Sequence, residues 1–472
     1  VSKLISIGIK APLHIMQSNG GILKSETVIK KPATIVESGP AAGVIGAAFI
    51  ANFSTHKNLI TLDMGGTTAK ASIVEDGQIT KTTEFEVGAG INLSSQLVKG
   101  GGHALKLSVV DVSEIGAGGG SIVSVDKNKR ITVGPKSSGA FPGPACYDNG
   151  GSEPTLTDAF VILGYINPNH LVSGEMKLNA KKSHTIMKSK VGDFLEKNLF
   201  DVSHGVTILA SSTMMRAVKA VTTYRGRDPR DYALFSFGGS GPILAAEVAR
   251  QLQINTLIIP PKPGLFSAFG LLFSNIEHEF VQSFYCHIDD INEKDLERSF
   301  IKLEKKAISM LLNEGIIREQ ISIYRQADLR YSGQAFELII PVNSKDHIKT
   351  IKEKFNFEHE KTYGFQTDED QIDIVNLRVI GNVDNPIQVN LEKTMSLELS
   401  NNKKESKVLR RKAYFGNNKK FIDTPIISRK DIYKKPLQGP LIIEEYDSTV
   451  VVPPGWKAGI DRFENIIMKF IK

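Results

Sequence analysis

The alternation of apolar and polar residues is clearest in the first quarter of the chain. Residues 59–62 and 67–74 are mostly apolar or β-branched, and residues 78–87 alternate between apolar and polar side chains. Glycine-containing turn sequences separate these runs, at residues 63–66 and 76–77. Asp-Gly at the second turn is a strong hairpin signal. The pattern therefore predicts three antiparallel strands in a meander, with Asp63 at the first turn.

The next part of the chain, to about residue 260, alternates between strand and helix patterns. Strands are predicted at residues 109–115, 121–125, 130–133, 232–237 and 256–259, and helices at residues 203–224 and 243–252. Strands that alternate with helices favour the α/β fold class.

Charged, amphipathic segments replace the glycine-rich sequence beyond about residue 280. Asn292 is a candidate helix cap, and Leu296, Phe300 and Leu303 follow on one helical face. Further strands are predicted at residues 321–331, 335–342 and 372–383, a helix at residues 347–363, and a small β-rich tail at the end. We therefore expect two domains, residues 1–280 and residues 281–472, the second α+β and β-rich.

Composition narrows the class of protein. Of 472 residues, 41% are hydrophobic and 23% charged, which excludes collagen-like, disordered and disulfide-scaffold proteins. The net charge of +7 is spread along the chain, so we expect no nucleic-acid partner. Only two cysteines occur, which favours a reducing compartment, the cytoplasm. No run of 18 apolar residues is present, so no membrane span is predicted.

One segment departs from this even distribution of charge. Residues 401–412 hold six basic residues against one acid. An exposed loop is the favoured interpretation, and anion binding is the alternative.

The turn after Asp63 is the first candidate for chemistry. Gly65 and Gly66 let backbone N–H groups approach a phosphate, and Thr67 and Thr68 add hydroxyl donors. Asp63 can hold, through water, the Mg²⁺ that accompanies ATP. A hairpin turn that binds nothing is an equally weighted alternative. The sequence contains no Walker loop, which needs Gly-x-x-x-x-Gly-Lys followed by Ser or Thr.

A second glycine turn lies between a predicted strand and a predicted helix. It contains Gly238, Gly239 and Gly241, with Pro242 in the first helical turn. Such a helix N-terminus suits a nucleotide or another anion, and a simple packing turn is the alternative. The turn resembles the hydrolase elbow Gly-x-Ser-x-Gly, but Pro242 replaces the last glycine, which argues against Ser240 as a nucleophile.

Two other loops and one helix start are weaker candidates. Residues 116–120, which include Gly118 and Gly119, and residues 141–147 are too rich in glycine or proline for an ordinary core. Such segments are typical of loops over a site. Ser38 is a candidate helix cap, and a buried helix start is favoured there over a second phosphate contact.

A series of short motifs runs in order along nearly the whole chain. They stand at residues 16–21, 37–43, 63–70, 115–122, 139–147, 154–159, 225–231, 237–242, 439–445 and 447–456. The series is similar to the A subunit of the hydantoinase/oxoprolinase family. The aspartate-led meander and the glycine turns also resemble the actin-like ATPase (ribonuclease H-like) core.

The resemblance implies a reaction and a partner. Family members use ATP and Mg²⁺ to phosphorylate the oxygen of a cyclic amide, such as 5-oxoproline or a hydantoin, and a B-type subunit completes ring hydrolysis. A hetero-oligomer is therefore expected. Carried over to this sequence, Asp63 is the catalytic and metal-binding residue. The implied nucleotide contacts are Gly65, Gly66, Thr67, Thr68, Gly118, Gly119, Gly238, Gly239 and Gly241.

Two departures from the family pattern keep alternatives open. The family often has histidine two residues after the proline of the second glycine turn, and Leu244 stands there. The family's A subunit also begins with another domain that carries its own Asp-x-Gly-Gly-Thr turn, whereas this sequence starts at Val1, near the second such turn. We therefore expect part of the ATP cleft to lie outside this chain. The alternatives are a ketone carboxylase subunit, a non-catalytic nucleotide-binding module and a sugar kinase.

Overall fold

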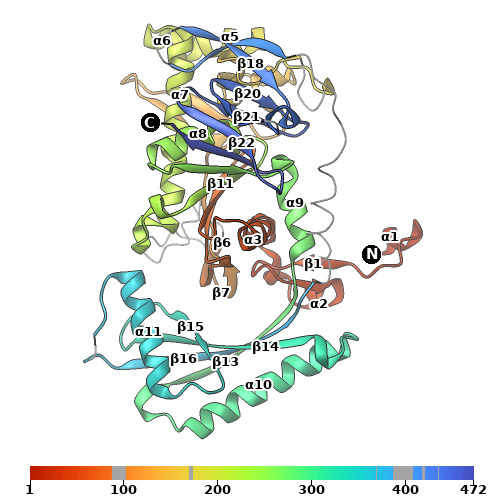
Figure 1. The fold of residues 1–472 in the computed structure, drawn as a ribbon, viewed down its shortest axis with the longest axis vertical. Helices are drawn as coiled ribbons and strands as arrows, with labels where there is room; N and C mark the ends of the chain where they lie inside the picture. Colours follow the sequence, from red (N-terminus) through yellow and green to blue (C-terminus); the bar gives the residue numbers. More distant parts are fainter. Residues whose placement is uncertain are drawn as a thin grey trace.

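The structure is a computed structural model that describes residues 1–87, 103–169, 174–367, 369–385, 408–416, 420–433 and 435–471. It has a mixed α/β fold with two bodies, one above the other in Figure 1. The large body contains the described residues within 31–275 and 408–471, and the small body contains those within 276–385 with the hairpin at residues 14–24 and the short helix at residues 25–30 that packs on it. None of the described helices is long and apolar enough to cross a membrane.

A nine-stranded sheet forms the centre of the large body. Its order is β19-β22-β23-β12-β11-β3-β4-β5, and β8 pairs with β4 off this path. The strands are β3 (Leu59–Met64), β4 (Ala69–Glu75), β5 (Gln78–Ile79), β8 (Ser113–Ile115), β11 (Ala233–Phe237), β12 (Thr256–Ile259), β19 (Leu437–Gln438), β22 (Trp456–Ile460) and β23 (Ile466–Phe470). β3, β4 and β5 pair antiparallel, whereas β11 is parallel to both β3 and β12. The predicted meander is confirmed.

The third strand of the meander is shorter than predicted. β5 ends at Ile79, because the carbonyl of Thr80 instead accepts the N–H of Asp111 at 2.9 Å. The chain then continues as β6 (Lys81–Val87), which pairs with β7 (His103–Val110) outside the main sheet. The predicted strand at residues 109–115 is likewise divided between β7 and β8.

Helices cover both faces of the nine-stranded sheet. They are α3 (Ser38–Phe53), α4 (Leu156–Ile162), α5 (Ala180–Met187), α6 (Asp193–Leu195), α7 (Leu199–Val221), α8 (Gly241–Gln251) and α9 (Phe266–Gly270). Because side chains alternate along a strand, Ile60 and Leu62 of β3 enter the core under α7 and α8. Leu59 enters the opposite core, under α3. Asp63 therefore shares the α3 face with Leu59.

The small body is a six-stranded sheet with two long helices on one face. The sheet order is β1-β2-β13-β16-β14-β15. Its elements are β1 (His14–Met16), β2 (Ile22–Lys24), β13 (Ile276–His287), β14 (Ile321–Tyr331), β15 (Leu338–Val342), β16 (Ile372–Val383), α10 (Glu293–Asn313) and α11 (Ile348–Tyr363). The Asn292 side chain caps α10 by accepting the Lys294 N–H at 3.0 Å, and Leu296, Phe300 and Leu303 are buried, as predicted.

Short elements complete the described chain. They are α1 (Ser2–Ser6), α2 (Ser25–Lys30), β9 (Ser121–Val125), β10 (Ile131–Ser137), β17 (Leu409–Tyr414), β18 (Phe421–Ile427), β20 (Leu441–Glu444) and β21 (Thr449–Val452). The basic segment at residues 401–412 lies partly outside the described residues. The loop expected there is wrong for residues 409–412, which belong to β17, where Arg411 donates to the carbonyl of Gly164 at 2.7 Å and to Glu444 at 2.8 Å.

The C-terminal tail packs on the large body rather than on the small one. β22 and β23 extend the nine-stranded sheet, and Ile443 and Val451 share a core with Ile60. In Figure 1 the blue tail accordingly lies against green α8 and β11. A division of the sequence at residue 280 marks the entry into the small body, but the chain returns to the large body at residue 408.

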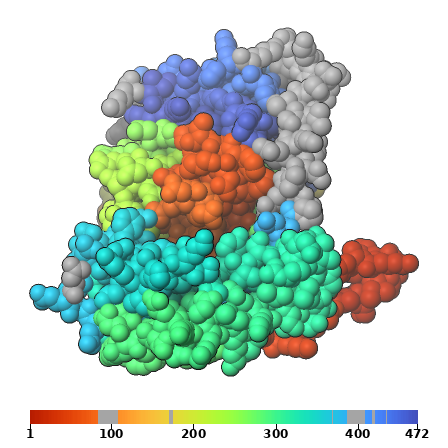
Figure 2. Space-filling view, turned by 60° about the horizontal axis from the view of Figure 1, so that its bottom comes forward, coloured from red at the N-terminus to blue at the C-terminus, as the bar shows by residue number. Residues whose placement is uncertain are grey.

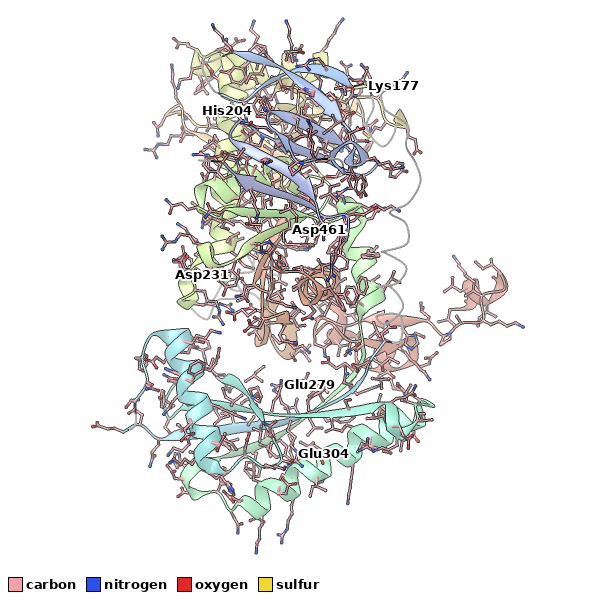
Figure 3. The ribbon with its side chains drawn as sticks, viewed as in Figure 1. Lys177, His204, Asp231, Glu279, Glu304 and Asp461 are labelled. Carbon is pink, nitrogen blue, oxygen red and sulfur yellow. The ribbon has the colours of Figure 1, made fainter. Side chains whose placement is uncertain are left out.

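The two bodies meet through paired charges. Arg227 of the large body binds Glu75 through two nitrogens, at 3.0 and 2.8 Å, and Lys361 of α11 lies 3.4 Å from the same carboxylate. In Figure 2 the small body, green to cyan, abuts the orange surface of the meander. Figure 3 labels Glu279 of β13 on the side of the small sheet that faces the large body, and Glu304 on α10 beyond it.

Candidate functional site

The turns that follow β3 and β11 meet at Asp63. Parallel pairing of β3 with β11 places the carboxyl ends of both strands at one edge of the sheet, where open α/β sheets bind ligands. Gly238 has φ +82°, and a Cβ there would lie 2.5 Å from Asp63 Oδ1 and 2.4 Å from the Met64 carbonyl oxygen. The Ser240 N–H donates to that same carbonyl at 3.1 Å. The fold thus brings together two turns that are about 175 residues apart in the sequence.

The glycine turn at residues 116–120 packs on the other side of the Asp63 turn. A Cβ on Gly118 would lie 2.5 Å from both the Gly66 carbonyl carbon and the Thr67 nitrogen. The Gly119 N–H donates to the Gly65 carbonyl at 3.0 Å. Thr157 then fixes Gly119, whose carbonyl accepts both the N–H and the hydroxyl of Thr157 at 2.8 Å. The three sequence-predicted turns therefore form one continuous cluster.

Gly65 and Gly66 differ from the glycines packed around them. Apart from the residue itself and its two neighbours in sequence, no atom of the described chain lies within 4 Å of the position that a Cβ would take on either residue. Neither residue has a positive φ. Gly66 and Thr67 are exposed, and Gly65 and Thr68 are half-buried. Among the described residues, neither packing nor backbone conformation requires glycine here, and a ligand that approaches the backbone closely, as a phosphate does, would fit beside them.

The carboxylate of Asp63 lies in a row of charged side chains across three strands. The strand register places Lys70 of β4 directly opposite Asp63, and Glu114 of β8 opposite Lys70. The Lys70 ammonium is 3.6 Å from Glu114. Burial raises the pKa of Asp63, and the charge of Lys70 and a hydrogen bond from Ser267 act against that rise. The sequence analysis did not identify Lys70, although the predicted hairpin register around Asp63 was a usable signal for it.

The N-terminus of α3 approaches the same face of the sheet. The helix begins at Ser38, so the expectation that Ser38 caps it is wrong, because Glu37 occupies the cap position. Instead the Ser18 hydroxyl accepts the Glu37 N–H at 3.0 Å. Burial raises the pKa of Glu37. The positive charge of Lys70 opposes this rise, and the negative charge of Glu114 adds to it. These mutual effects place Glu37 within electrostatic range of the charged row.

A loop between β20 and β21 covers the Gly238 turn from the C-terminal tail. The Ser448 hydroxyl donates to the Gly239 carbonyl at 3.2 Å. Asp447 Oδ2 accepts the Leu265 N–H at 3.1 Å, and a Cβ on Gly264 would lie 2.6 Å from the Asp447 carbonyl oxygen. Sequence reasoning missed this contact, because a contact between positions nearly 200 residues apart leaves no local pattern.

The loop at residues 141–147 is anchored behind the glycine cluster by one carboxylate. Asp158 is fully buried and accepts the N–H groups of Cys146 and Thr155, both at 2.9 Å, and the Ser183 hydroxyl at 2.7 Å. Burial raises the pKa of the Cys146 thiol far above its ordinary value. This cysteine is therefore an unreactive packing residue.

The residues at the cluster fit the triphosphate of Mg·ATP. The open backbone at Gly65 and Gly66 suits phosphate oxygens, and Asp63 supplies one carboxylate. Mg²⁺ is commonly held by one or two carboxylates together with substrate phosphates and waters. In the described ranges no group of three or more His, Cys, Asp or Glu side chains could hold a metal ion by itself.

A separate cavity of about 1360 Å³ lies between the two bodies. Glu75, Lys81 and Arg227 line it from the large body, and Arg325 and Phe357 line it from the small body. Its lining includes none of the three glycine turns. The cavity is therefore distinct from the cluster at Asp63.

Comparison with known protein families gives matches along most of the chain. The sequence model described as "Hydantoinase/oxoprolinase" matches residues 2–280, and that described as "Hydantoinase/oxoprolinase C-terminal domain" matches residues 289–470.

Three curated proteins are similar to the chain. An uncharacterized protein of Methanocaldococcus jannaschii is 36% identical over 98% of the chain, the caprolactamase subunit alpha of Pseudomonas jessenii 27% over 96%, and the 5-oxoprolinase of Saccharomyces cerevisiae 31% over 95%. The chain spans 66%, 64% and 35% of these proteins' own lengths.

Two solved structures share the fold. The ATP-dependent caprolactamase from Pseudomonas jessenii aligns with a TM-score of 0.80 at 24% identity, over 99% of this chain and 67% of that one. Nucleotide-free acetone carboxylase aligns with a TM-score of 0.75 at 22% identity, over 100% of this chain and 66% of that one.

Proposed function

Because the chain belongs to the hydantoinase/oxoprolinase family, we propose that it is the ATP-handling part of an enzyme that hydrolyses a cyclic amide. The proposed substrate is 5-oxoproline or a hydantoin. ATP phosphorylates the amide oxygen, and the activated ring carbon is then attacked by water. A B-type hydantoinase/oxoprolinase subunit completes the ring opening in a hetero-oligomer, and the two free thiols favour the cytoplasm as the compartment.

The observation that carries the proposal is the open backbone at Gly65 and Gly66 beside Asp63. A triphosphate placed there would meet backbone N–H groups of the turn, together with the hydroxyls of Thr67 and Thr68. Bound Mg²⁺ would neutralise part of the phosphate charge, and Asp63 is the residue that would hold it. Gly118 and Gly119 on one side, and Gly238, Gly239 and Gly241 on the other, would shape the walls.

An unstrained amide needs this activation. Its carbonyl carbon is a poor electrophile, and phosphorylation turns the oxygen into a leaving group before water attacks. Phosphoryl transfer is accelerated mainly by positioning and by electrostatic stabilisation of the phosphoryl oxygens. A rigid turn with an adjacent helix N-terminus, that of α8, supplies both.

We propose an actin-like ATPase core for the large body on the strength of its sheet order. The antiparallel meander β5-β4-β3 is followed by β11 and β12, which are parallel to β3 and connected through helices. Such a core binds its nucleotide between two halves, so we also propose that a further segment or chain completes the cleft.

Ketone carboxylation is the second candidate, because acetone carboxylase shares this fold along the whole chain. The experiment is ATP turnover by this chain assembled with its B-type partner and any segment needed to complete the cleft. We expect ADP formation that depends on 5-oxoproline or hydantoin and needs no bicarbonate. ADP formation that requires both acetone and bicarbonate would replace the amide substrate with a ketone. If neither the cyclic amide nor acetone with bicarbonate raises the rate of ADP formation, both candidates are contradicted.

A further inference from the structure

The charged row beside Asp63 contains one cation, Lys70, to which the proposed function gives no role. Lys70 is in β4, and the strand register pairs it with Asp63 of β3 on one side and with Glu114 of β8 on the other. The Cβ atoms of residues paired in this way lie about 5 Å apart on one face of the sheet. Lys70 therefore extends from the same face as Asp63, at the edge of the sheet where the glycine turns meet.

Lys70 also lies close to the phosphate turn along the chain. The Gly65 N–H donates to the Thr68 carbonyl at 3.2 Å and closes the turn, and β4 begins at the next residue, Ala69. Two residues of chain span at most about 7 Å, so the backbone of Lys70 is no farther than that from Thr68. The side chain of Lys70 thus starts beside both the turn and Asp63.

The Lys70 ammonium has donors to spare. It lies 3.6 Å from Glu114, beyond the usual length of a charged hydrogen bond, and it donates no hydrogen bond to any other residue in the described ranges. Lys81 offers a comparison at similar burial, because its side chain is 18% exposed against 24% for Lys70, yet its ammonium donates to Glu277 at 2.7 Å. An ammonium has three N–H donors, and those of Lys70 remain available to a ligand beside the turn.

A phosphate group beside Asp63 would use these donors. The Mg²⁺ that accompanies ATP bridges oxygens of the β- and γ-phosphates. Because Asp63 would hold that ion, the same phosphates would lie next to the residue that is paired with Asp63 across the strands, which is Lys70. The three glycine turns contain no lysine or arginine of their own. Lys70 therefore supplies a positive charge that the turns lack.

We infer that Lys70 is a catalytic residue, which binds the γ-phosphoryl group of ATP and stabilises its oxygens during transfer to the amide oxygen. The inference deepens the proposed function and rests on it. In the transfer, the bond from the γ-phosphorus to the bridging oxygen breaks and leaves its electron pair on ADP. The amide oxygen supplies the electron pair of the new bond, and the ring nitrogen carries the resulting positive charge. Lys70 forms and breaks no covalent bond, and its fixed charge acts on the phosphoryl oxygens.

The first arm of the test compares Mg·ATP with Mg·ADP in calorimetry on the full chain. Lys70→Gln removes the charge and keeps a polar side chain. The variant should bind Mg·ATP at least about tenfold more weakly than the unsubstituted protein, and Mg·ADP within about threefold, because ADP lacks the γ-phosphoryl group. Retained ADP binding also shows that the variant is folded. Equal losses for the two nucleotides, or no loss for either, would overturn the inference.

Lys352→Gln is the matched control. Lys352 is also half-buried and lies near a carboxylate, 2.9 Å from Asp289, but in the small body, away from the glycine turns. It should change neither affinity. A loss of ATP affinity in Lys352→Gln as large as that in Lys70→Gln would reduce the effect to one of net charge and overturn the inference.

The second arm measures ADP formation by the chain assembled with its B-type partner, with 5-oxoproline or hydantoin as the substrate. Lys70→Gln should lower kcat by at least about 100-fold, as when one group that stabilises charge in a transition state is removed, and should leave KM for the cyclic amide within about threefold. A kcat above about one third of normal would overturn the inference. Failure of the proposed function is distinguishable, because the unsubstituted enzyme would then show no amide-dependent ADP formation, whereas the comparison of ATP with ADP would still report on the γ-phosphoryl contact.

Discussion

Glycines serve two different purposes within one cluster of turns. Gly118 and Gly238 are glycine because neighbouring backbone fills the space of a side chain, at 2.5 and 2.4 Å from the position of a Cβ. Gly65 and Gly66 have no neighbour within 4 Å in the described chain and no positive φ. The first pair is required by the fold, and the second pair is required only if something outside the chain approaches. We therefore expect a ligand to approach the backbone at Gly65 and Gly66 rather than at the packed glycines.

The largest expected effect is a loss of stability when a packed glycine is replaced. Gly238→Ala places a Cβ against Asp63 and Met64 at φ +82°, so we expect a loss of unfolding free energy of about 3 kcal/mol or more. Gly239→Ala is the matched control, because its nearest neighbour is 3.9 Å away. Denaturant unfolding of both variants measures the difference. Equal stabilities would show that the turn can rearrange to accommodate a Cβ at Gly238. The distinction between packed and open glycines would then be contradicted.

A second prediction concerns stability away from the turns, at the contact between the two bodies. Burial raises the pKa of Glu75, but hydrogen bonds from Arg227 and Tyr232 outweigh it and hold the pKa at about 2. Because the pKa of Glu75 is lower in the folded protein than the value of 4.5 in the unfolded chain, ionised Glu75 stabilises the fold at any pH above 4.5. This contribution is lost as the pH falls from 4.5 through about 2.

Glu75→Gln should therefore lower the unfolding free energy at pH 7 by about 2 kcal/mol and flatten its decline between pH 4.5 and 2. Its affinity for Mg·ATP should match that of the unsubstituted chain, because Glu75 lines the separate cavity. Acid titration of unfolding, followed by calorimetry, checks both. Weakened nucleotide binding would mean that stability and binding are coupled across the molecule. It would contradict the claim that nucleotide binding depends on the glycine turns alone.

A third prediction tests the open glycines. Gly66→Ala should leave stability within about 0.5 kcal/mol of the unsubstituted protein, as at surface sites without special features. It should weaken Mg·ATP binding at least about tenfold, because a methyl group occupies the space of a phosphate oxygen. Gly205→Ala, an unpacked glycine in α7, is the control and should not affect binding. Equal binding by both variants would leave Gly66 without a ligand role.

The smallest expected effect concerns the support of the packed turn. Thr157→Val removes the hydroxyl that donates to the Gly119 carbonyl at 2.8 Å, and the N–H of the same residue still donates to it. We expect a loss of about 1 kcal/mol. Thr213→Val, whose hydroxyl bonds within α7 to Leu209, is a suitable comparison in thermal unfolding. A loss no larger than that of Thr213→Val would show that Thr157 does not support Gly119.

Local patterns predicted the elements of this fold well and their long-range assembly poorly. The Asp-Gly turn at residue 76, the Asn292 cap and the apolar face of α10 follow from interactions within a few residues, and each is confirmed. The return of the C-terminal strands to the nine-stranded sheet depends on contacts across hundreds of residues. Nothing in the alternation of a short strand specifies which sheet it joins.

The candidate site shows the same division. The three glycine turns were identifiable because each is a cluster of glycines directly after a predicted strand, where glycine marks a turn. Their mutual contacts, Gly118 on Gly66 and Gly238 on Asp63, depend on the packing of separate segments. Glu37 was outside the predicted set, because its relation to Lys70 exists only after α3 has packed on the sheet.

The most direct test of the central claim is calorimetry of Mg·ATP binding to this chain and to its Asp63→Asn variant. The account predicts saturable binding that is weakened at least about tenfold in the variant, since the amide keeps the shape of the carboxylate and removes the charge that would face Mg²⁺. Equal binding by both proteins would show that the Asp63 turn does not hold the nucleotide.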